Sequence, residues 1–221
     1  MEHNTSPEII YDKAGKPHEV VDFHDDYTGA KLGFWFFLFT ELMLFGAMFL
    51  VFAFFFYRFS EDFVNASSTL NILLGGTNTF VLLVSTYFMG MSLINLKNGE
   101  VSKAKTKIYI TIGLSILFLL IKYFEWMAEI NHGIYPDSEL LNAKAHGEII
   151  FFGLYFTMTG LHGVHIVVGI ILMLWVLFLI NKEKITSTNY VVLENIALYW
   201  DLVHLVWVFL FPLFYIIGIG R

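Results

Sequence analysis

The stretch IIFFGLYFTMTGLHGVHIVVGIILMLWVLFLI, residues 149–180, decides the fold of this chain. It contains no Asp, Glu, Lys, Arg or Pro. An apolar run of about 20 residues is long enough to cross the roughly 30 Å hydrocarbon core of a bilayer as a helix. At about 1.5 Å per residue this run reaches nearly 50 Å, so we expect a membrane helix that tilts strongly or projects beyond the bilayer.

Four further apolar runs are long enough to span a membrane, and each is too long for a barrel strand. The sequence therefore predicts an all-α fold, a polytopic membrane bundle of five transmembrane helices at residues 32–57, 70–96, 108–129, 149–180 and 195–219. Residues 1–30 are predicted to form a polar, mobile cytoplasmic tail, and residues 31–221 a single membrane domain. Residues 131–147 are expected to fold as an outer loop.

The composition agrees with a membrane protein and excludes several other classes. Hydrophobic residues make up 57% of the 221 residues and charged residues only 14%, against about 25% charged in a soluble domain. The absence of cysteine excludes disulfides, thiolate zinc sites and iron–sulfur clusters. The net charge of −6 arises mainly in the tail, and no basic patch indicates nucleic-acid binding. The tail lacks the pattern of a secretory signal peptide.

The lysines and arginines predict the orientation. Nine of them lie in the tail or in the connections after the second and fourth spans, and three lie on the opposite side. Cytoplasmic loops carry the excess of basic residues, so we expect a cytoplasmic N-terminus and a periplasmic C-terminus.

Polar side chains at membrane depth are costly, by about 2.5–3.5 kcal/mol for a charge on insertion scales, and they usually face the bundle with a partner. Glu41 is close to the midplane of the first span. It is either a proton-linked carboxylate or a residue that hydrogen-bonds a neighbouring helix. Asn78 lies near the middle of the second span, where it is expected to hydrogen-bond another helix.

The third span carries Lys122, Glu125 and Glu129 at i, i+3 and i+7, which places all three on one helix face. Lys122 is expected to pair with Glu125. An ion pair that fixes helix packing and a transport pathway are both compatible with this pattern.

Three histidines lie at membrane depth. His162 and His165 share one turn of the fourth span, and His204 lies on the fifth. Two imidazoles on one turn cannot bind haem from opposite sides, although His204 could supply an opposing ligand. Neutral histidines that join helices are the simpler interpretation. Asp201 and His204, at i, i+3, are expected to form a local carboxylate–imidazole bond.

Tryptophans are predicted to contact lipid headgroups or a partner, namely Trp35, Trp200 and Trp207. The sequence contains no nucleophile–base pair, no phosphate loop and no three-histidine metal set. We therefore expect no catalytic, cofactor-binding or metal site in this chain.

The motifs together resemble subunit III of the haem–copper respiratory oxidases, over roughly residues 31–221. The motifs follow the order of that family and comprise GFWFFLFTELMLFG (33–46), TNTFVLL (77–83), YFE (123–125), TGLHGVH (159–165) with Gly169, YW (199–200) and VW (206–207). The chain begins at what would be the third helix of the seven-helix mitochondrial type, so it resembles the five-helix bacterial form. Lys122 replaces an acid found in many members. The usual order His–x–x–Asp is reversed at Asp201 and His204, which puts the roles of these two residues in doubt.

The resemblance implies a non-redox subunit of a cytochrome c oxidase in the bacterial inner membrane. Such a subunit packs beside subunit I and subunit II, binds phospholipid, and supports proton uptake by the catalytic subunit. The haems and copper would belong to the partners. A quinol oxidase or a nitric-oxide-reductase-associated homologue are alternatives within the family. A haem-binding membrane cytochrome and a proton-coupled carrier are alternatives outside it.

Overall fold

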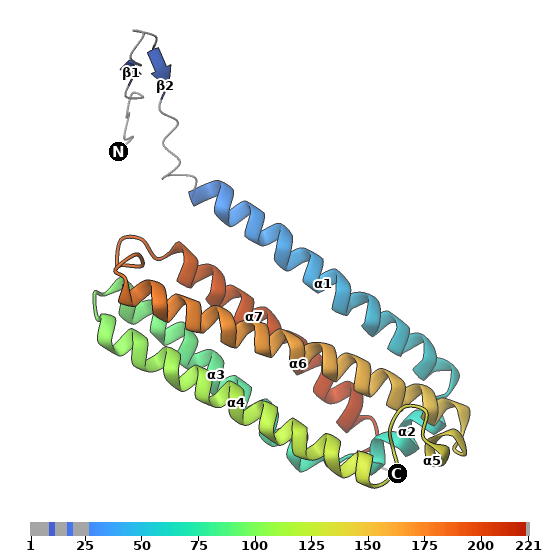
Figure 1. Ribbon diagram of the computed structural model, residues 1–221. Coiled ribbons are helices and arrows are strands. Elements are labelled where there is room, and N and C mark those ends of the chain that lie inside the picture. The colour runs from blue at the N-terminus through green and yellow to red at the C-terminus, as the bar shows by residue number, and fades with distance from the viewer. Residues whose placement is uncertain (1–8, 12–16, 20–26, 220–221) are drawn as a thin grey trace.

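The computed structural model describes residues 9–11, 17–19 and 27–219, which form an almost wholly helical chain (Figure 1). Five helices are long and apolar enough to cross a membrane. They are α1 (Tyr27–Arg58), α3 (Ile72–Lys97), α4 (Val101–Asn131), α6 (His146–Asn181) and α7 (Val191–Phe211). The predicted number and order of spans are confirmed, and α6 is the longest of the five.

The N-terminal region differs from a plain tail. Strands β1 (Ile9–Tyr11) and β2 (Pro17–Glu19) pair antiparallel. Helix α1 begins at Tyr27, so helical structure starts inside the predicted tail of residues 1–30. Residues 1–8, 12–16 and 20–26 lie outside the described residues, and the mobility of the tail stays a prediction.

Helix ends extend beyond the apolar runs. Helix α4 begins at Val101, one lysine-rich stretch before the predicted span at 108–129, and α7 begins at Val191 rather than at 195. The added residues of α4 include three lysines and an alanine, which are good helix formers, so this helix continues where the hydrophobic signal stops. The apolar run indicates the part of a helix that lipid surrounds, not the bounds of the helix.

Two short helices lie in the connections. Helix α2 (Ser60–Thr69) follows α1, and α5 (Glu139–Asn142) lies in the predicted loop at 131–147. Asp62 of α2 accepts a hydrogen bond of 3.1 Å from the backbone N–H of Gly147, and thereby caps the start of α6. The sequence did not predict α2, because its residues are polar and contain no long apolar run.

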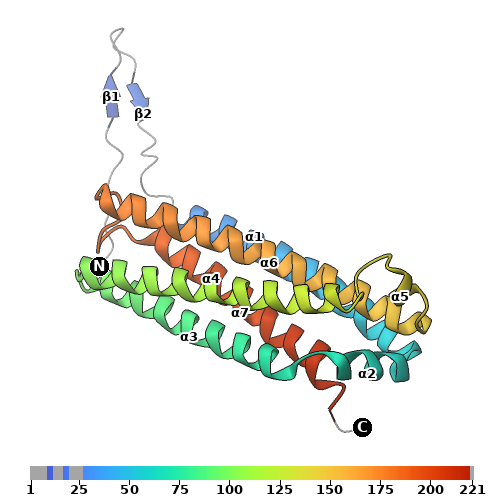
Figure 2. The same cartoon turned by 60° about the horizontal axis from the view of Figure 1, so that its bottom comes forward.

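Helices α3, α4, α6 and α7 form the main bundle, and α1 lies along α6 and α7 at its edge (Figures 1 and 2). The buried side chains of α1 within the described residues are Leu38, Phe45 and Phe52, spaced by seven. A spacing of seven returns to nearly the same side of a helix, so α1 contacts the bundle along one narrow seam. Most of its remaining surface is exposed.

An aromatic cluster joins α1 and α2 to the C-terminal part of the bundle. Beyond α7 the chain continues as a π-helical turn, η1 (Pro212–Ile216). Phe214 of this turn meets Phe52 at 5.2 Å between ring centroids, and Phe63 of α2 meets Phe151 of α6 at 5.4 Å, both edge to face. Such pairs add about 0.5–1.5 kcal/mol beyond burial.

The two ends of the bundle differ in charge. The connections α3–α4 and α6–α7 lie at the same end as the start of α1 (Figure 1). At this end Glu194 of α7 pairs with Lys31 at 2.9 Å and with Lys97 at 3.4 Å. The lysine-rich connections therefore share one end, as the orientation argument requires. The assignment of this end to the cytoplasm stays a prediction.

Close packing of α6 on α7 depends on Gly169. A Cβ at this position would lie 2.7 Å from Cζ3 of Trp200, whose side chain is 1% exposed. Gly169→Ala is expected to lower the stability of the subunit by about 1–3 kcal/mol, because the indole ring has no room to move.

The control for this prediction is Gly153→Ala on the same helix, where a Cβ would meet nothing within 4 Å. This change should be neutral or stabilising, by about 0.5–1 kcal/mol, since alanine favours the helix more than glycine does. Thermal unfolding of the purified subunit-containing complex in detergent measures both. Equal melting temperatures for the two variants would contradict the prediction.

Candidate functional site

Lys122 of α4 is the centre of a buried polar network. Its ammonium lies 3.1 Å from Oε2 of Glu125 and donates to the hydroxyls of Tyr155 at 3.0 Å and Tyr215 at 2.9 Å. Tyr155 donates to Oε1 of Glu125 at 2.9 Å, and Tyr215 donates to the same oxygen. All four residues are at most 7% exposed. Opposite charges and complete hydrogen bonding allow a lysine and a glutamate to be buried at this depth.

This network joins three parts of the fold. Lys122 and Glu125 come from α4, Tyr155 from α6, and Tyr215 from the turn η1. Pro212 opens that turn, and a proline inside a helix removes a backbone hydrogen bond, which favours the switch from α to π geometry. The Tyr215 ring then packs over Gly75, where a Cβ would lie 2.9 Å from the ring.

The predicted pair between Lys122 and Glu125 is present, and the sequence missed both tyrosines. Glu129 is buried on the same face, but no hydrogen bond or ion pair joins it to Lys122 or Glu125 among the residues that the structure describes. The signal for Tyr215 was Pro212, which marks an irregular turn inside the last apolar run. Tyr155 had no local signal, because tyrosine in an apolar run is common.

Glu41 and His165 form a second polar contact, between α1 and α6. Nε2 of His165 lies 2.7 Å from Oε2 of Glu41, and Nδ1 lies 2.8 Å from the carbonyl oxygen of Leu161. A carbonyl only accepts, so Nδ1 carries the hydrogen. One proton must then lie between Nε2 and the carboxyl group, either on the acid or on the imidazole. In both forms the pair has no net charge, which suits its position inside the membrane.

Neither His162 nor His204 joins helices through its ring nitrogens. Both nitrogens of each ring lack a hydrogen-bond partner among the described residues. His162 is fully buried between the rings of Phe118 and Trp207, at 5.6 and 5.1 Å between centroids. The expectation that the membrane histidines join helices therefore holds for His165 through a hydrogen bond and for His162 through ring contacts to α4 and α7, and no hydrogen bond of His204 supports it among the described residues.

The residues present do not fit an axial haem pair. Both nitrogens of His165 are engaged, and His162 is enclosed by aromatic rings. Within residues 9–11, 17–19 and 27–219, no three His, Cys, Asp or Glu side chains gather as metal ligands would.

The predicted bond between Asp201 and His204 does not form. Asp201 is exposed on the surface of α7, whereas the side chain of His204 is buried. Positions three apart differ by roughly 60° around a helix. The short aspartate side chain stays on the outer face, and the imidazole turns inward.

Two further sequence expectations are wrong. Asn78 is fully buried, but its amide oxygen and nitrogen have no partner among the described residues, so the expected interhelical bond is not formed. Trp200 and Trp207 are also buried, and their indole N–H groups donate to Ser85 Oγ at 3.1 Å and to Thr79 Oγ1 at 3.0 Å on α3. These tryptophans fix α7 on α3 and do not contact lipid. Trp35 is 58% exposed on α1, as expected for a lipid or partner contact.

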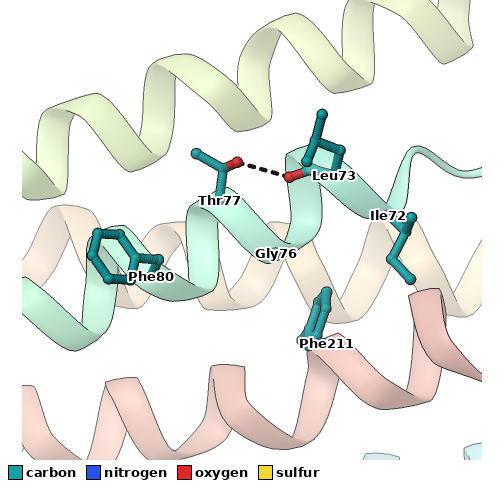
Figure 3. A pocket seen from close by; sticks show the side chains of 6 residues that line it. All are labelled: Ile72, Leu73, Gly76, Thr77, Phe80 and Phe211. Carbon is teal, nitrogen blue, oxygen red and sulfur yellow. Dashed lines mark hydrogen bonds between the residues drawn. The ribbon is translucent and has the colours of Figure 1, made fainter.

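Two apolar grooves open on the surface of the bundle. One, of about 540 Å³, lies between α3 and the end of α7 and is shown in Figure 3. Thr77 lines it, but its hydroxyl donates to the carbonyl of Leu73 on its own helix at 2.8 Å, so the groove offers an apolar wall (Figure 3). The other, of about 390 Å³, lies between α4 and α6.

Comparison with known proteins gives a consistent result. The sequence model of the family described as cytochrome c oxidase subunit III matches residues 22–219. Cytochrome bo(3) ubiquinol oxidase subunit 3 of Buchnera aphidicola (subsp. Schizaphis graminum) is 25% identical over 187 residues, covering 85% of this chain and 93% of the relative. The Pseudomonas putida protein of the same description is 25% identical over 199 residues, with 89% of each chain covered. Quinol oxidase subunit 3 of Bacillus spizizenii is 26% identical over 189 residues, covering 86% of this chain and 87% of the relative.

Proposed function

Because this chain belongs to the cytochrome c oxidase subunit III family, we propose that it stabilises the catalytic subunit of its oxidase and supports proton uptake during oxygen reduction. The chain is a subunit III of a haem–copper terminal oxidase and a multi-pass protein of the bacterial cytoplasmic membrane. The observation that carries the proposal is the Glu41–His165 pair, a carboxyl–imidazole contact of 2.7 Å between α1 and α6.

The polar groups of this chain suit a supporting role better than a reaction site. Lys122 and Glu125 are saturated by each other and by two tyrosines, so neither is free to bind a substrate. Of the histidines that a membrane cytochrome would need, His165 is hydrogen-bonded through both ring nitrogens and His162 is enclosed by aromatic rings, so neither suits the axial position opposite His204. In the proposed assembly, electron transfer and oxygen chemistry take place on haem and copper in subunits I and II.

The groove between α4 and α6 supports the proposal that phospholipid binds here. Valines and glycines of α6 form one wall, and aromatic residues of α4 form the other; the lining includes Phe118, Tyr123, Trp126, Gly160, Gly163, Val164, Val167 and Val168. Lys122 also lines the groove, but all three of its N–H groups are used. The groove therefore fits an acyl chain. The indole N–H of Trp126 has no partner among the described residues and could donate to an ester oxygen.

Purification through an affinity tag on this chain tests the proposed function. We expect the tagged chain to bring down haem- and copper-containing subunits in a fixed ratio and with oxygen-reducing activity. The chain separated from that complex should have no haem band in its visible spectrum. A stoichiometric haem band on the separated chain would support a membrane cytochrome, and proton-coupled transport by the chain alone in liposomes would support a carrier.

Two electron donors are compatible with the proposed function, namely cytochrome c and a quinol. The description of the family names cytochrome c oxidase, whereas the names of the relatives from Buchnera, Pseudomonas and Bacillus favour a quinol oxidase. Oxygen uptake by the purified complex with reduced cytochrome c and with a reduced quinol distinguishes them. Turnover with quinol alone would assign the second candidate, and turnover with cytochrome c the first.

A further inference from the structure

One stripe of α7 lies between α1 and α3. Glu194, Asp201, Leu205 and Val208 are spaced by seven, four and three, so they follow one side of the helix. Next to this stripe, Phe209 meets Phe49 of α1 at 6.0 Å between ring centroids. On the opposite side Phe211 borders the groove with α3 (Figure 3). The stripe is therefore the floor of a surface that α1 and α3 flank.

The two acids of the stripe are in different situations. Glu194 lies at the lysine-rich end and pairs with Lys31 of α1 and Lys97 of α3. Asp201 lies two turns further, at the middle of α7, and its side chain is exposed. Among residues 27–219, no group donates a hydrogen bond or forms an ion pair with its carboxylate. Every other acidic or basic side chain in the middle of the five long helices, as far as they are described, is at least partly buried.

A carboxylate at the middle of a membrane helix needs a partner. Water does not solvate it there, and lipid acyl chains offer no hydrogen-bond donor. The other acid on the stripe indicates that the partner of Asp201 is positively charged, because Glu194 pairs with two lysines. The neighbouring positions Leu205 and Val208 are exposed and apolar, as in a contact between packed helices.

We infer that the α7 stripe is the surface on which a transmembrane helix of another oxidase subunit docks, with a lysine or arginine of that helix paired to Asp201. The adjoining groove of about 540 Å³ beside Phe211 gives space for a bulky apolar side chain of the same partner (Figure 3). This inference rests on the proposed function, since it takes the partner from the oxidase complex. It adds the face of contact and the chemistry of the contact residue.

Photocrosslinking locates the docked helix. A photoreactive amino acid at Leu205 is compared with one at Leu120 of α4; these leucines are 46% and 50% exposed, and the contact between Phe118 and Trp207 places them at similar depth. In the intact complex, Leu205 should give an adduct with an oxidase subunit, at a yield above the background set by Leu120. Adducts with lipid alone from Leu205 would overturn the inference.

The role of the Asp201 carboxylate is tested by measuring how much of this chain stays bound in the oxidase complex. Asp201→Asn and Asp201→Leu should each reduce the fraction of this chain that stays in the complex during detergent washing, by about tenfold where the partner cation is left unpaired in a buried contact. Helix content of the variant chains should not change, because Asp201 bonds to nothing within the described chain. Thr40→Val is the control, since its exposed hydroxyl bonds to its own helix at 2.7 Å.

The failures of the two proposals are distinguishable. If wild-type chain co-purifies with the oxidase and both Asp201 variants are retained like wild type, the docking inference is wrong and the proposed function stands. If the wild-type chain co-purifies with no haem- or copper-containing subunit, the proposed function fails first.

Discussion

Glu125→Ala should lower the stability of this subunit by about 3–5 kcal/mol, because removing one partner of a buried ion pair leaves the other charge uncompensated. Glu125 accepts from Lys122, Tyr155 and Tyr215, and these contacts join α4, α6 and η1. Their loss should release η1 from the bundle and cause the subunit to dissociate at lower temperature. Thermal unfolding of the purified complex, followed by the amount of this subunit that remains bound, measures the effect.

A matched control lies at the start of the same helix, where Glu100 directly precedes the first residue of α4. Glu100 and Lys103 have the same i, i+3 relation as Lys122 and Glu125, but their side chains are 40% and 67% exposed. Glu100→Ala should therefore cost about 1 kcal/mol or less. The double variant Lys122→Met with Glu125→Leu should recover much of the loss, since no charge is then left buried. Normal stability of Glu125→Ala would show that Lys122 reaches water or another partner.

The apolar runs predicted the five spans because lipid imposes a length and a composition on each helix separately. The i, i+3 spacing likewise predicted the pair of Lys122 and Glu125, because both residues lie on one helix. Tyr155 and Tyr215 could not be predicted in the same way. They reach Glu125 from other helices, and their positions depend on how α6 packs and on the turn at Pro212.

Helical spacing gives the face of a residue but not its partner. Asp201 and His204 have the same spacing as Lys122 and Glu125, yet no bond joins them, because α7 turns one residue outward and the other inward. Trp200 and Trp207 are typical of a membrane interface by residue type, but hydroxyl groups on α3 bind both of them inside the bundle. In the motif Thr77-Asn78-Thr79, Thr79 hydrogen-bonds a side chain of another helix, and Asn78 does not. Only the packing of α3 against α7 determines which of these side chains has a hydrogen-bond partner.

Glu41→Gln should leave assembly and stability close to wild type, within about 1 kcal/mol, and shorten the time for which the oxidase sustains turnover. The Nδ1–H of His165 donates to the carbonyl oxygen of Leu161, so neutral His165 has a lone pair at Nε2. A glutamine amide can donate to this lone pair as a protonated Glu41 does. The contact between α1 and α6 is thus kept, while the proton that the acid and the imidazole can exchange is lost.

Glu41→Leu separates the structural part of this contact from the proton-linked part. Leucine leaves Nε2 of His165 unpaired, which should cost about 1–3 kcal/mol and loosen α1 along its narrow seam. Both variants are compared by thermal unfolding and by oxygen uptake followed until the enzyme inactivates. If Glu41 matters only for packing, Glu41→Gln inactivates at the wild-type rate and only Glu41→Leu differs. If its proton matters, both inactivate early although only Glu41→Leu is less stable, because the two variants share the loss of the acid and differ only in the hydrogen bond to His165.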